Sequence, residues 1–331
     1  MTTDPAPFID AHHHLWEPQT LEYSWLRDIG APKPFGDPTP IQRDYIKDEF
    51  WAEASACGVV ASVHVQADGA LPDPVSESRW IAEQAARDPG AGQPGKWVGF
   101  VNLLGEDAQA VLEAHAAVPG FAGIRHIVAR TATAPKLSFV PSELMQDSRW
   151  QRNFGLLAGL GARFDLQLYP DQVDDAVALI SQHEDTTIIV DHCAGPYFLL
   201  EAHRRNAIPA AEPELAHWAE GVWRLSRLPN VSIKLSGLGM YHPHWSAQNC
   251  RVIFQTILDA FGPERVMLGS NFPVDKLFKT YAEVVGIWDE WLSPLSADEQ
   301  HNVRVGAASR AYGLADRSQA VLTVLRETAD G

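Results

Sequence analysis

Short apolar segments rich in β-branched residues recur eight times along this chain, and longer amphipathic segments separate them. The apolar segments span residues 8–15, 59–66, 97–104, 122–128, 163–169, 186–193, 231–235 and 266–270. The amphipathic segments span residues 41–57, 77–87, 107–117, 148–160, 172–182, 215–228, 247–261 and 281–292. These patterns predict strands and helices respectively, and their strict alternation over eight repeats predicts a parallel (β/α)8 TIM barrel.

The chain has 331 residues, which is enough for one barrel. We expect a single domain over residues 8–314, in which residues 296–314 form an extra C-terminal helix, followed by a C-terminal appendage over residues 315–331. The connections 17–40, 129–147 and 194–213 are long, and each follows a predicted strand. They are therefore expected at the carboxyl-terminal face of the barrel, where TIM-barrel active sites are built.

Composition excludes several classes of partner. The formal net charge is −16 and no run of lysine or arginine interrupts it, which disfavours nucleic acid. No apolar window approaches the length of a membrane span, and the N-terminal residues lack the pattern of a signal peptide. Three cysteines without a CxxC pair argue against a disulfide framework or a thiolate zinc site. We expect a cytoplasmic protein that acts on a small molecule, and the sequence leaves a homo-oligomer open.

Three consecutive histidines occupy the end of the first predicted strand. Because alternate side chains of a strand share a face, Asp10, His12 and His14 are expected to point one way and His13 the other. The run lies inside a strand pattern, which argues against a fragment of a purification tag. His192, at the end of the sixth strand, would bring the imidazoles to three, the usual number in a zinc site that keeps an open position.

Polar residues are also expected on the inner face of other strands. Such groups cost stability when buried, so their recurrence on one strand face predicts a site. They are His64 and Gln66 on the second strand, Asp165, Gln167 and Tyr169 on the fifth, and Lys234 and Ser236 on the seventh.

Two inner positions leave alternatives open. Only one of Arg125 and His126 on the fourth strand can point inward, and we predict Arg125, either bound to substrate or paired with a carboxylate. Lys234 would bind a substrate anion or pair with Asp165 or Asp191. Arg125 and Lys234 together favour an anionic substrate.

Six motifs in this order resemble the amidohydrolase-2 family of the amidohydrolase superfamily, and in particular its branch of TIM-barrel lactonases. They are DAHHHLW at 10–16, VQA at 65–67, GIRH at 123–126, VDHCAGP at 190–196, KLSG at 234–237 and GSNFP at 269–273. The resemblance runs from about residue 8 to residue 314. It implies a hydrolase in which a water, activated with or without a divalent metal such as zinc or manganese, attacks a lactone carbonyl at the barrel mouth.

The resemblance also assigns roles to individual residues. His12, His14 and His192 correspond to metal ligands, and Arg125 corresponds to a substrate contact. The eighth-strand position is normally an aspartate that binds metal and acts as general base, but here it is Asn271, whose amide cannot accept a proton at neutral pH. Asp275 would be a substitute base or a cap of the following helix.

The predicted function is therefore opening of a small lactone or related cyclic ester. Candidate catalytic residues are His192, Asn271 and Asp275, and candidate substrate-binding residues are Gln66, Arg125, His126, Tyr169 and Lys234. One alternative is non-oxidative decarboxylation of an aromatic or muconate-type acid. Relatives with that activity tend to have a fifth-strand histidine as a metal ligand, where this chain has Gln167 and Tyr169. A second alternative is a degenerate barrel that only binds a small ligand, for which Asn271 is the main argument.

Overall fold

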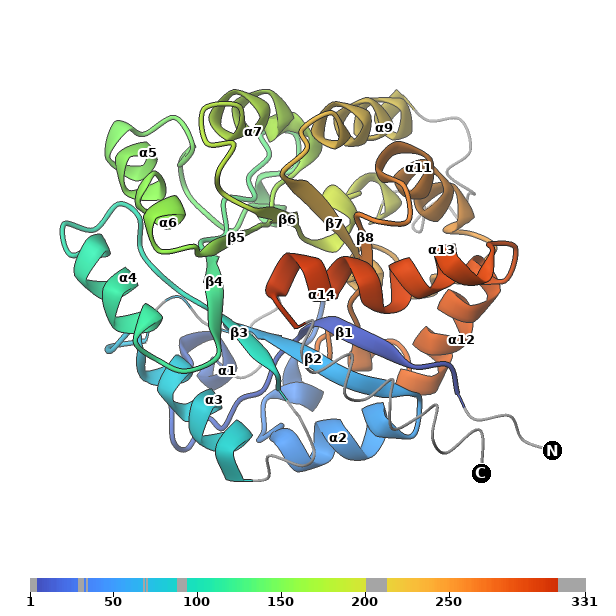
Figure 1. Cartoon of the computed structure of the whole chain (residues 1–331), viewed down its shortest axis with the longest axis horizontal. Helices are drawn as coiled ribbons and strands as arrows, with labels where there is room; N and C mark the ends of the chain where they lie inside the picture. Colours follow the sequence, from blue (N-terminus) through green and yellow to red (C-terminus); the bar gives the residue numbers. More distant parts are fainter. Residues whose placement is uncertain are drawn as a thin grey trace.

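Eight parallel strands form a nearly closed barrel in the computed structural model (Figure 1), which describes residues 5–28, 33, 35–67, 69, 71–87, 94–200 and 213–314. The strands are β1 Phe8–His13, β2 Val59–Val65, β3 Lys96–Gly99, β4 Phe121–Arg125, β5 Arg163–Leu166, β6 Ile188–Val190, β7 Val231–Leu235 and β8 Val266–Leu268. Each pairs with the next in sequence. Backbone bonds from His14 N to Phe272 O and from Asn271 N to His12 O, both 2.7 Å, join the last strand to the first. The predicted TIM barrel is confirmed.

Helices surround the barrel and lie between successive strands in the sequence. They are α1 Ser24–Arg27, α2 Lys47–Ser55, α3 Ser76–Arg87, α4 Ala108–Ala116, α5 Ser148–Phe154, α6 Leu156–Gly159, α7 Val173–Ile180, α9 Pro213–Ser226, α10 Leu238–Tyr241, α11 Arg251–Phe261, α12 Tyr281–Leu292, α13 Ala297–His301 and α14 Ala307–Tyr312. No helix in the described part of the chain is both long enough and apolar enough to cross a membrane. The predicted appendage, 315–331, lies outside the described residues.

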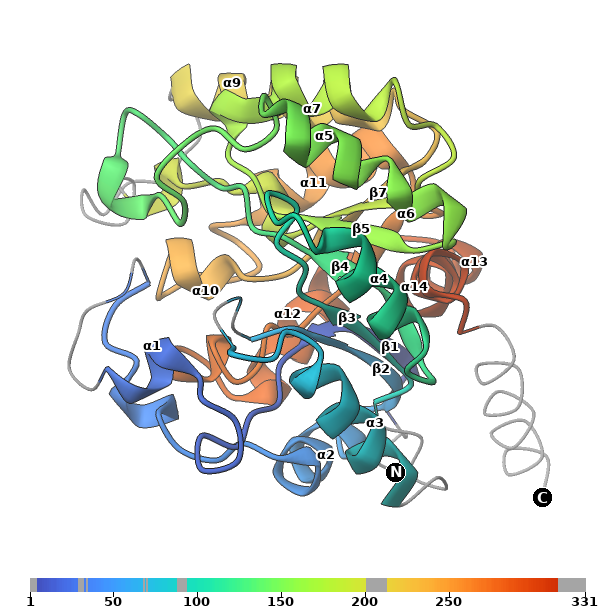
Figure 2. The same ribbon diagram turned by 90° about the vertical axis from the view of Figure 1, so that its left-hand side faces the viewer.

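The extra C-terminal helix closes one end of the barrel. Ser296 and Glu299 cap α13 reciprocally, a π-helical segment Asn302–Gly306 joins it to α14, and Gly313 ends α14 with a φ of 68°. Side chains of α14, including Ala308 and Tyr312, form one buried cluster with inward residues of the strands. Figure 2 shows α13 and α14 at one end of the barrel and α1 and α10 at the other. The end lined by the carboxyl ends of the strands is the one that remains for a site.

The first strand departs from strict alternation. Its pairing with β2 gains one residue between Asp10, opposite Ser62, and His13, opposite His64, which is a β-bulge. Ile9 and Ala11 therefore belong to the buried cluster with α14, whereas Asp10 accepts hydrogen bonds from Ser270 and from Tyr281 of α12. The prediction that Asp10 shares a face with His12 and His14 is wrong, because the bulge reverses the alternation between them.

His13 and His64 both face the helices. His13 stacks on Phe50 of α2 with ring centroids 4.0 Å apart, which confirms its predicted outward direction. His64 accepts a hydrogen bond from Leu15 N at Nδ1 and contacts Glu77 of α3 at Nε2, 3.1 Å away. The inward placement predicted for His64 is therefore wrong, since Ala61, Val63 and Val65 occupy the inner positions of β2.

Gly123 lies two residues before Arg125, at a point where β4 and β5 approach each other closely. A Cβ at Gly123 would lie 2.3 Å from the carbonyl oxygen of Arg163, a backbone atom that cannot move aside cheaply. We expect Gly123→Ala to lower the free energy of unfolding by roughly 1–3 kcal/mol, measured by urea denaturation. Gly286→Ala is the control: it lies in an exposed part of α12 with open space around it and should stabilise the chain by about 0.5–1 kcal/mol. Equal effects of the two substitutions would contradict this account of the β4–β5 contact.

Candidate active site

A pocket of about 380 Å³ opens at the carboxyl ends of the strands. Six polar residues from the strand ends form what we call the floor: His14, Gln66, Arg125, Gln167, His192 and Asn271. Seven apolar residues form what we call the wall: Trp16, Trp25, Phe35, Ile127, Phe139, Met240 and Val274. Lys33, Ala67, Gly69 and Ser138 complete the lining.

The backbone after β6 turns His192 into the pocket. Ile189 faces the barrel interior, so simple alternation would send Asp191 inward and His192 outward. Instead His192, Cys193 and Ala194 adopt φ values of 52°, 56° and 56°, followed by Gly195 at 62°. A left-handed backbone at three consecutive non-glycine residues costs energy, and such strain clusters at functional sites. The turn places Asp191 and His192 on the same side of the strand end.

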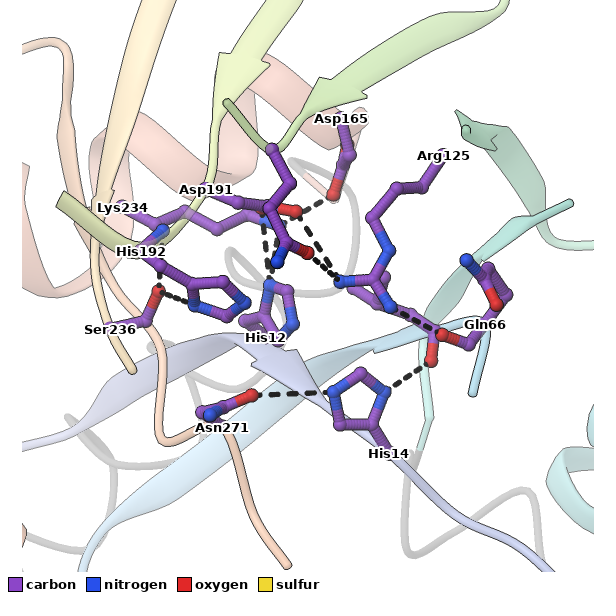
Figure 3. A network of polar contacts seen from close by, with 12 residues as sticks. His12, His14, Gln66, Arg125, Asp165, Asp191, His192, Lys234, Ser236 and Asn271 are labelled. Carbon is purple, nitrogen blue, oxygen red and sulfur yellow. Dashed lines mark hydrogen bonds and ion pairs between the residues drawn. The ribbon is translucent and has the colours of Figure 1, made fainter. Parts of the chain in front are cut away.

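His12 and His192 lie together beside a buried carboxylate (Figure 3). Their ring centroids are 4.5 Å apart, and Asp191 Oδ1 lies 3.2 Å from His12 Nδ1. Ser236 Oγ accepts a hydrogen bond from His192 N and lies 3.0 Å from His192 Nδ1, which fixes the ring. The third ring, of His14, is centred 5.0 Å from that of His12. His12 and His192 therefore meet beside Asp191, and the ring of His14 lies next to that of His12; their role as ligands of one ion stays a prediction.

A buried ion-pair network lies below the floor. Lys234 Nζ lies 2.5 Å from Asp165 Oδ2, 2.9 Å from Asp191 Oδ1 and 3.1 Å from His12 Nδ1. Tyr312 of α14 donates to Asp165 at 2.8 Å. Burial raises the pKa of Asp165 to about 6 despite the opposing effect of Lys234. Of the two alternatives for Lys234, the structure therefore shows the ion pairs with Asp165 and Asp191, and Lys234 does not line the pocket.

Arg125 points inward, as predicted, and its guanidinium is held by neighbours in the floor. Nη2 donates to the Gln66 carbonyl at 2.7 Å and Nη1 donates to Gln167 Oε1 at 3.2 Å. Asp191 Oδ2 lies 3.6 Å from Nη1. Arg125 Nε is buried without a hydrogen-bond partner. A guanidinium held in place in this way, with its Nε–H still available as a donor, can polarise a substrate carbonyl.

Asn271 lies between His14 and Asp275. His14 Nδ1 donates to the Val65 carbonyl at 2.7 Å, so the Nε2 of a neutral ring carries a lone pair, and this atom is 3.3 Å from Asn271 Oδ1. Asn271 Nδ2 donates to Asp275 Oδ1 at 3.1 Å. Asp275 is buried, does not line the pocket, and reaches it only through Asn271. It begins the short turn Asp275–Leu277, but no side-chain cap bond forms there.

Burial makes the three site histidines neutral at pH 7. It lowers the pKa of His14 and of His192 to about 3, and nearby Arg125 acts in the same direction on both. The pKa of His12 lies well below its ordinary value because of burial and Lys234. Burial raises the pKa of Asp275 to about 7. Neutral imidazoles are the form that metals bind.

The residues present fit a divalent cation. His12, Asp191 and His192 offer ligand atoms that all lie within 4.8 Å of one another. His12 Nε2 is buried without a hydrogen-bond partner, and two acceptors, His14 Nε2 and Asn271 Oδ1, face each other at 3.3 Å. A cation accepts lone pairs from atoms of this kind, and nitrogen with carbonyl oxygen is a donor set that zinc or manganese accepts.

Besides Lys234, two further predicted substrate-binding residues lie outside this pocket. His126 faces α5, where Trp150 Nε1 donates to its Nδ1 at 3.2 Å. Tyr169 donates its hydroxyl to the Leu137 carbonyl at 2.9 Å and lines a smaller neighbouring cavity.

Some residues at the site were not predicted from the sequence. Asp191 was considered only as a partner of Lys234, and the wall residues Trp25, Phe35 and Phe139 were hidden in connections predicted only to lie at this face.

Asp275 gives the fold a pH dependence that a single substitution removes. Its pKa is about 7 in the folded chain against 3.8 for an ordinary carboxyl, so between these values the folded chain binds more protons than the unfolded one. The contribution of Asp275 to stability is therefore fully present below about pH 4 and is lost as the pH rises through 7. We expect the free energy of unfolding of the wild type, relative to Asp275→Asn, to fall by up to about 4 kcal/mol between pH 4 and pH 8 in urea titrations. A difference that does not change with pH would show that Asp275 is ionised in the folded chain throughout.

Comparison with known proteins identifies the family. A family model described as Amidohydrolase matches residues 9–314. Uncharacterized protein y4mH of Sinorhizobium fredii is 32% identical over 277 residues, 82% of this chain and 87% of that protein. The L-fucono-1,5-lactonase of Burkholderia multivorans is 29% identical over 323 residues, 95% of this chain and 98% of that enzyme. The crystal structure of an amidohydrolase from Burkholderia multivorans with bound zinc has a TM-score of 0.73 at 27% identity and covers 93% of this chain and 99% of its own. Together with the barrel and the inward histidines described above, these matches show that the chain belongs to the amidohydrolase family.

Proposed function

We propose that this protein hydrolyses a small lactone at the floor of the pocket. The observation that carries the proposal is the convergence of His12, His14 and His192 beside the Arg125 guanidinium, all buried at the carboxyl ends of the strands. The similarity to an L-fucono-1,5-lactonase over 95% of the chain supports the same reaction class.

Arg125 is the group we assign to the carbonyl. When the oxygen of water bonds to the carbonyl carbon, negative charge develops on the former carbonyl oxygen, and a fixed guanidinium stabilises it. The bond between that carbon and the ring oxygen then breaks, and the ring oxygen takes up a proton to give a hydroxy acid. Gln66 and Gln167 support this role because they hold two of the guanidinium nitrogens in place.

His12, His14 and His192 are proposed as ligands of a divalent cation. An imidazole whose pKa is about 3 is a weak base at neutral pH, yet it binds a cation without competition from protons. When bound, zinc or manganese would act as a Lewis acid and lower the pKa of a coordinated water. Asp191 orients His12 through Nδ1 and so leaves Nε2 available.

Asp275 and Asn271 have supporting roles in this proposal. The pKa of Asp275, about 7, suits a general base, but its carboxyl is separated from the pocket by the Asn271 amide. We therefore propose that Asp275 positions Asn271, and that Asn271 contributes its carbonyl oxygen to the cation site.

The charges in the floor and in the ion-pair network below it favour an uncharged substrate ring. Arg125 and Lys234 face Asp165 and Asp191, so these four charges nearly cancel. The expectation of an anionic substrate stays a prediction. Decarboxylation is less favoured, because Gln167 directly follows the fifth strand, where a histidine would be expected, and its side-chain oxygen is already bound to Arg125.

Hydrolysis is tested by incubating the purified chain with a panel of five- and six-membered lactones, including L-fucono-1,5-lactone, and following acid release in a pH-stat. We expect turnover that Arg125→Met lowers by roughly 100- to 1000-fold in kcat, as for loss of an oxyanion donor. Arg149→Met is the matched control, since Arg149 is exposed and pairs with Glu106 on the surface. Release of carbon dioxide without net acid would instead support the decarboxylase, and binding without turnover would support the degenerate barrel.

Cation binding is tested without reference to activity. Protein purified without chelator and dialysed against zinc should retain about one equivalent by elemental analysis, because the site offers three neutral imidazoles. His12→Gln should lower that content severalfold, whereas His126→Gln, a buried histidine outside the pocket, should not. Equal zinc in all three proteins, or none in the wild type, would overturn the ligand assignment.

A further inference from the structure

The wall of the pocket presents carbon surfaces whose polar atoms are already engaged. Trp16 Nε1 donates to the Arg43 carbonyl and Trp25 Nε1 donates to the Ala67 carbonyl, both at 2.8 Å. These two indoles meet in an edge-to-face contact with ring centroids 5.3 Å apart, and Trp25 contacts Phe35 in the same way. A ligand on this side of the pocket therefore meets aromatic carbon without a free hydrogen-bond donor from either tryptophan.

The polar residue Ser138 near the wall is also engaged: its Oγ donates to the Thr131 carbonyl and accepts from Thr131 N. Lys33 is different, because its Nζ lies 3.9 Å from Asp28 Oδ2, beyond hydrogen-bond distance. A polyhydroxylated ring would leave hydroxyl groups without partners on this side, and a buried polar group without a partner is costly.

The wall continues into a second, smaller cavity. Phe35, Phe139 and Met240 line both cavities. The second one adds only apolar and aromatic side chains, namely Leu137, Tyr169, Leu200 and Tyr241, and the Tyr169 hydroxyl is bound to the Leu137 carbonyl. The second cavity has a volume of only about 10 Å³, so the room for a substituent lies in the pocket of about 380 Å³, against the wall.

We propose that the substrate is a lactone whose ring carries an apolar aryl or alkyl substituent, and that this substituent lies against the wall. The inference rests on the proposed lactone hydrolysis: the ring carbonyl lies at the floor beside Arg125, and the substituent covers Trp25, Phe35 and Phe139. Polar atoms without partners lie in the floor, where Gln66 Oε1 and Arg125 Nε are buried. We therefore expect sugar lactones to be poorer substrates, because hydroxyl groups that face the aromatic wall would lack partners.

The test compares kcat/KM for δ-valerolactone, its 6-butyl and 6-phenyl derivatives, and L-fucono-1,5-lactone. We expect the substituted lactones to exceed δ-valerolactone by roughly tenfold or more and the sugar lactone to fall below them. Phe139→Ala should reduce the ratio between 6-phenyl- and unsubstituted lactone severalfold. Trp223→Ala is the control, because Trp223 on α9 is also a partly exposed aromatic, 45% against 39% for Phe139, and lies outside both cavities. A sugar lactone preferred by the wild type, or an unchanged ratio in Phe139→Ala, would overturn the inference.

A binding measurement separates this inference from the proposed reaction. Calorimetric titration of the wild type with 6-phenyl-δ-lactam and with unsubstituted δ-lactam, neither of which needs to be hydrolysed, should show roughly tenfold tighter binding of the phenyl compound. If no lactone turns over but this preference is present, the proposed hydrolysis fails and the apolar subsite stands. If lactones turn over and the two lactams bind equally, hydrolysis stands and the subsite is wrong.

Discussion

The ammonium group of Lys234 is the interaction on which the site depends. It pairs with Asp165 on β5 and with Asp191 at the end of β6, Asp191 contacts His12 Nδ1 on β1, and Tyr312 links the same network to the helix that closes the barrel. Removing one partner from a buried charge pair leaves the other uncompensated, at a cost of about 3–5 kcal/mol. These groups are therefore interdependent. Through His12 and Asp191, the network also fixes two of the groups that border the pocket floor.

The sequence was sufficient for the architecture because the barrel depends on a repeated pattern. Alternation of apolar strands and amphipathic helices predicts eight strands in order, and ordinary strand alternation correctly sends His13 outward to Phe50. The assignment of the three histidines to one site relied on the family resemblance. In the fourth strand, Arg125 was correctly placed inward and His126 against the helices. Where local pattern and backbone geometry agree, residues can be assigned to faces from the sequence.

Two of the errors occur where the backbone departs from regular geometry. The bulge in β1 places Asp10 and His12 on different faces of the strand, and no feature of the residues DAHHH predicts this bulge. The left-handed turn at His192 brings two consecutive residues, Asp191 and His192, to one site, which strand alternation forbids. The wall could not be predicted for a different reason. Phe35 and Phe139 come from separate long connections, and only tertiary structure brings them together.

The most direct test of the account is a crystal structure of the protein with 6-phenyl-δ-lactam bound. Our account predicts the lactam carbonyl oxygen within hydrogen-bond distance of the Arg125 guanidinium, beside His12, His14 and His192, with the phenyl ring against Trp25 and Phe139. A lactam bound with its carbonyl directed away from Arg125, or bound outside this pocket, would contradict the claim that the floor is where a lactone is opened.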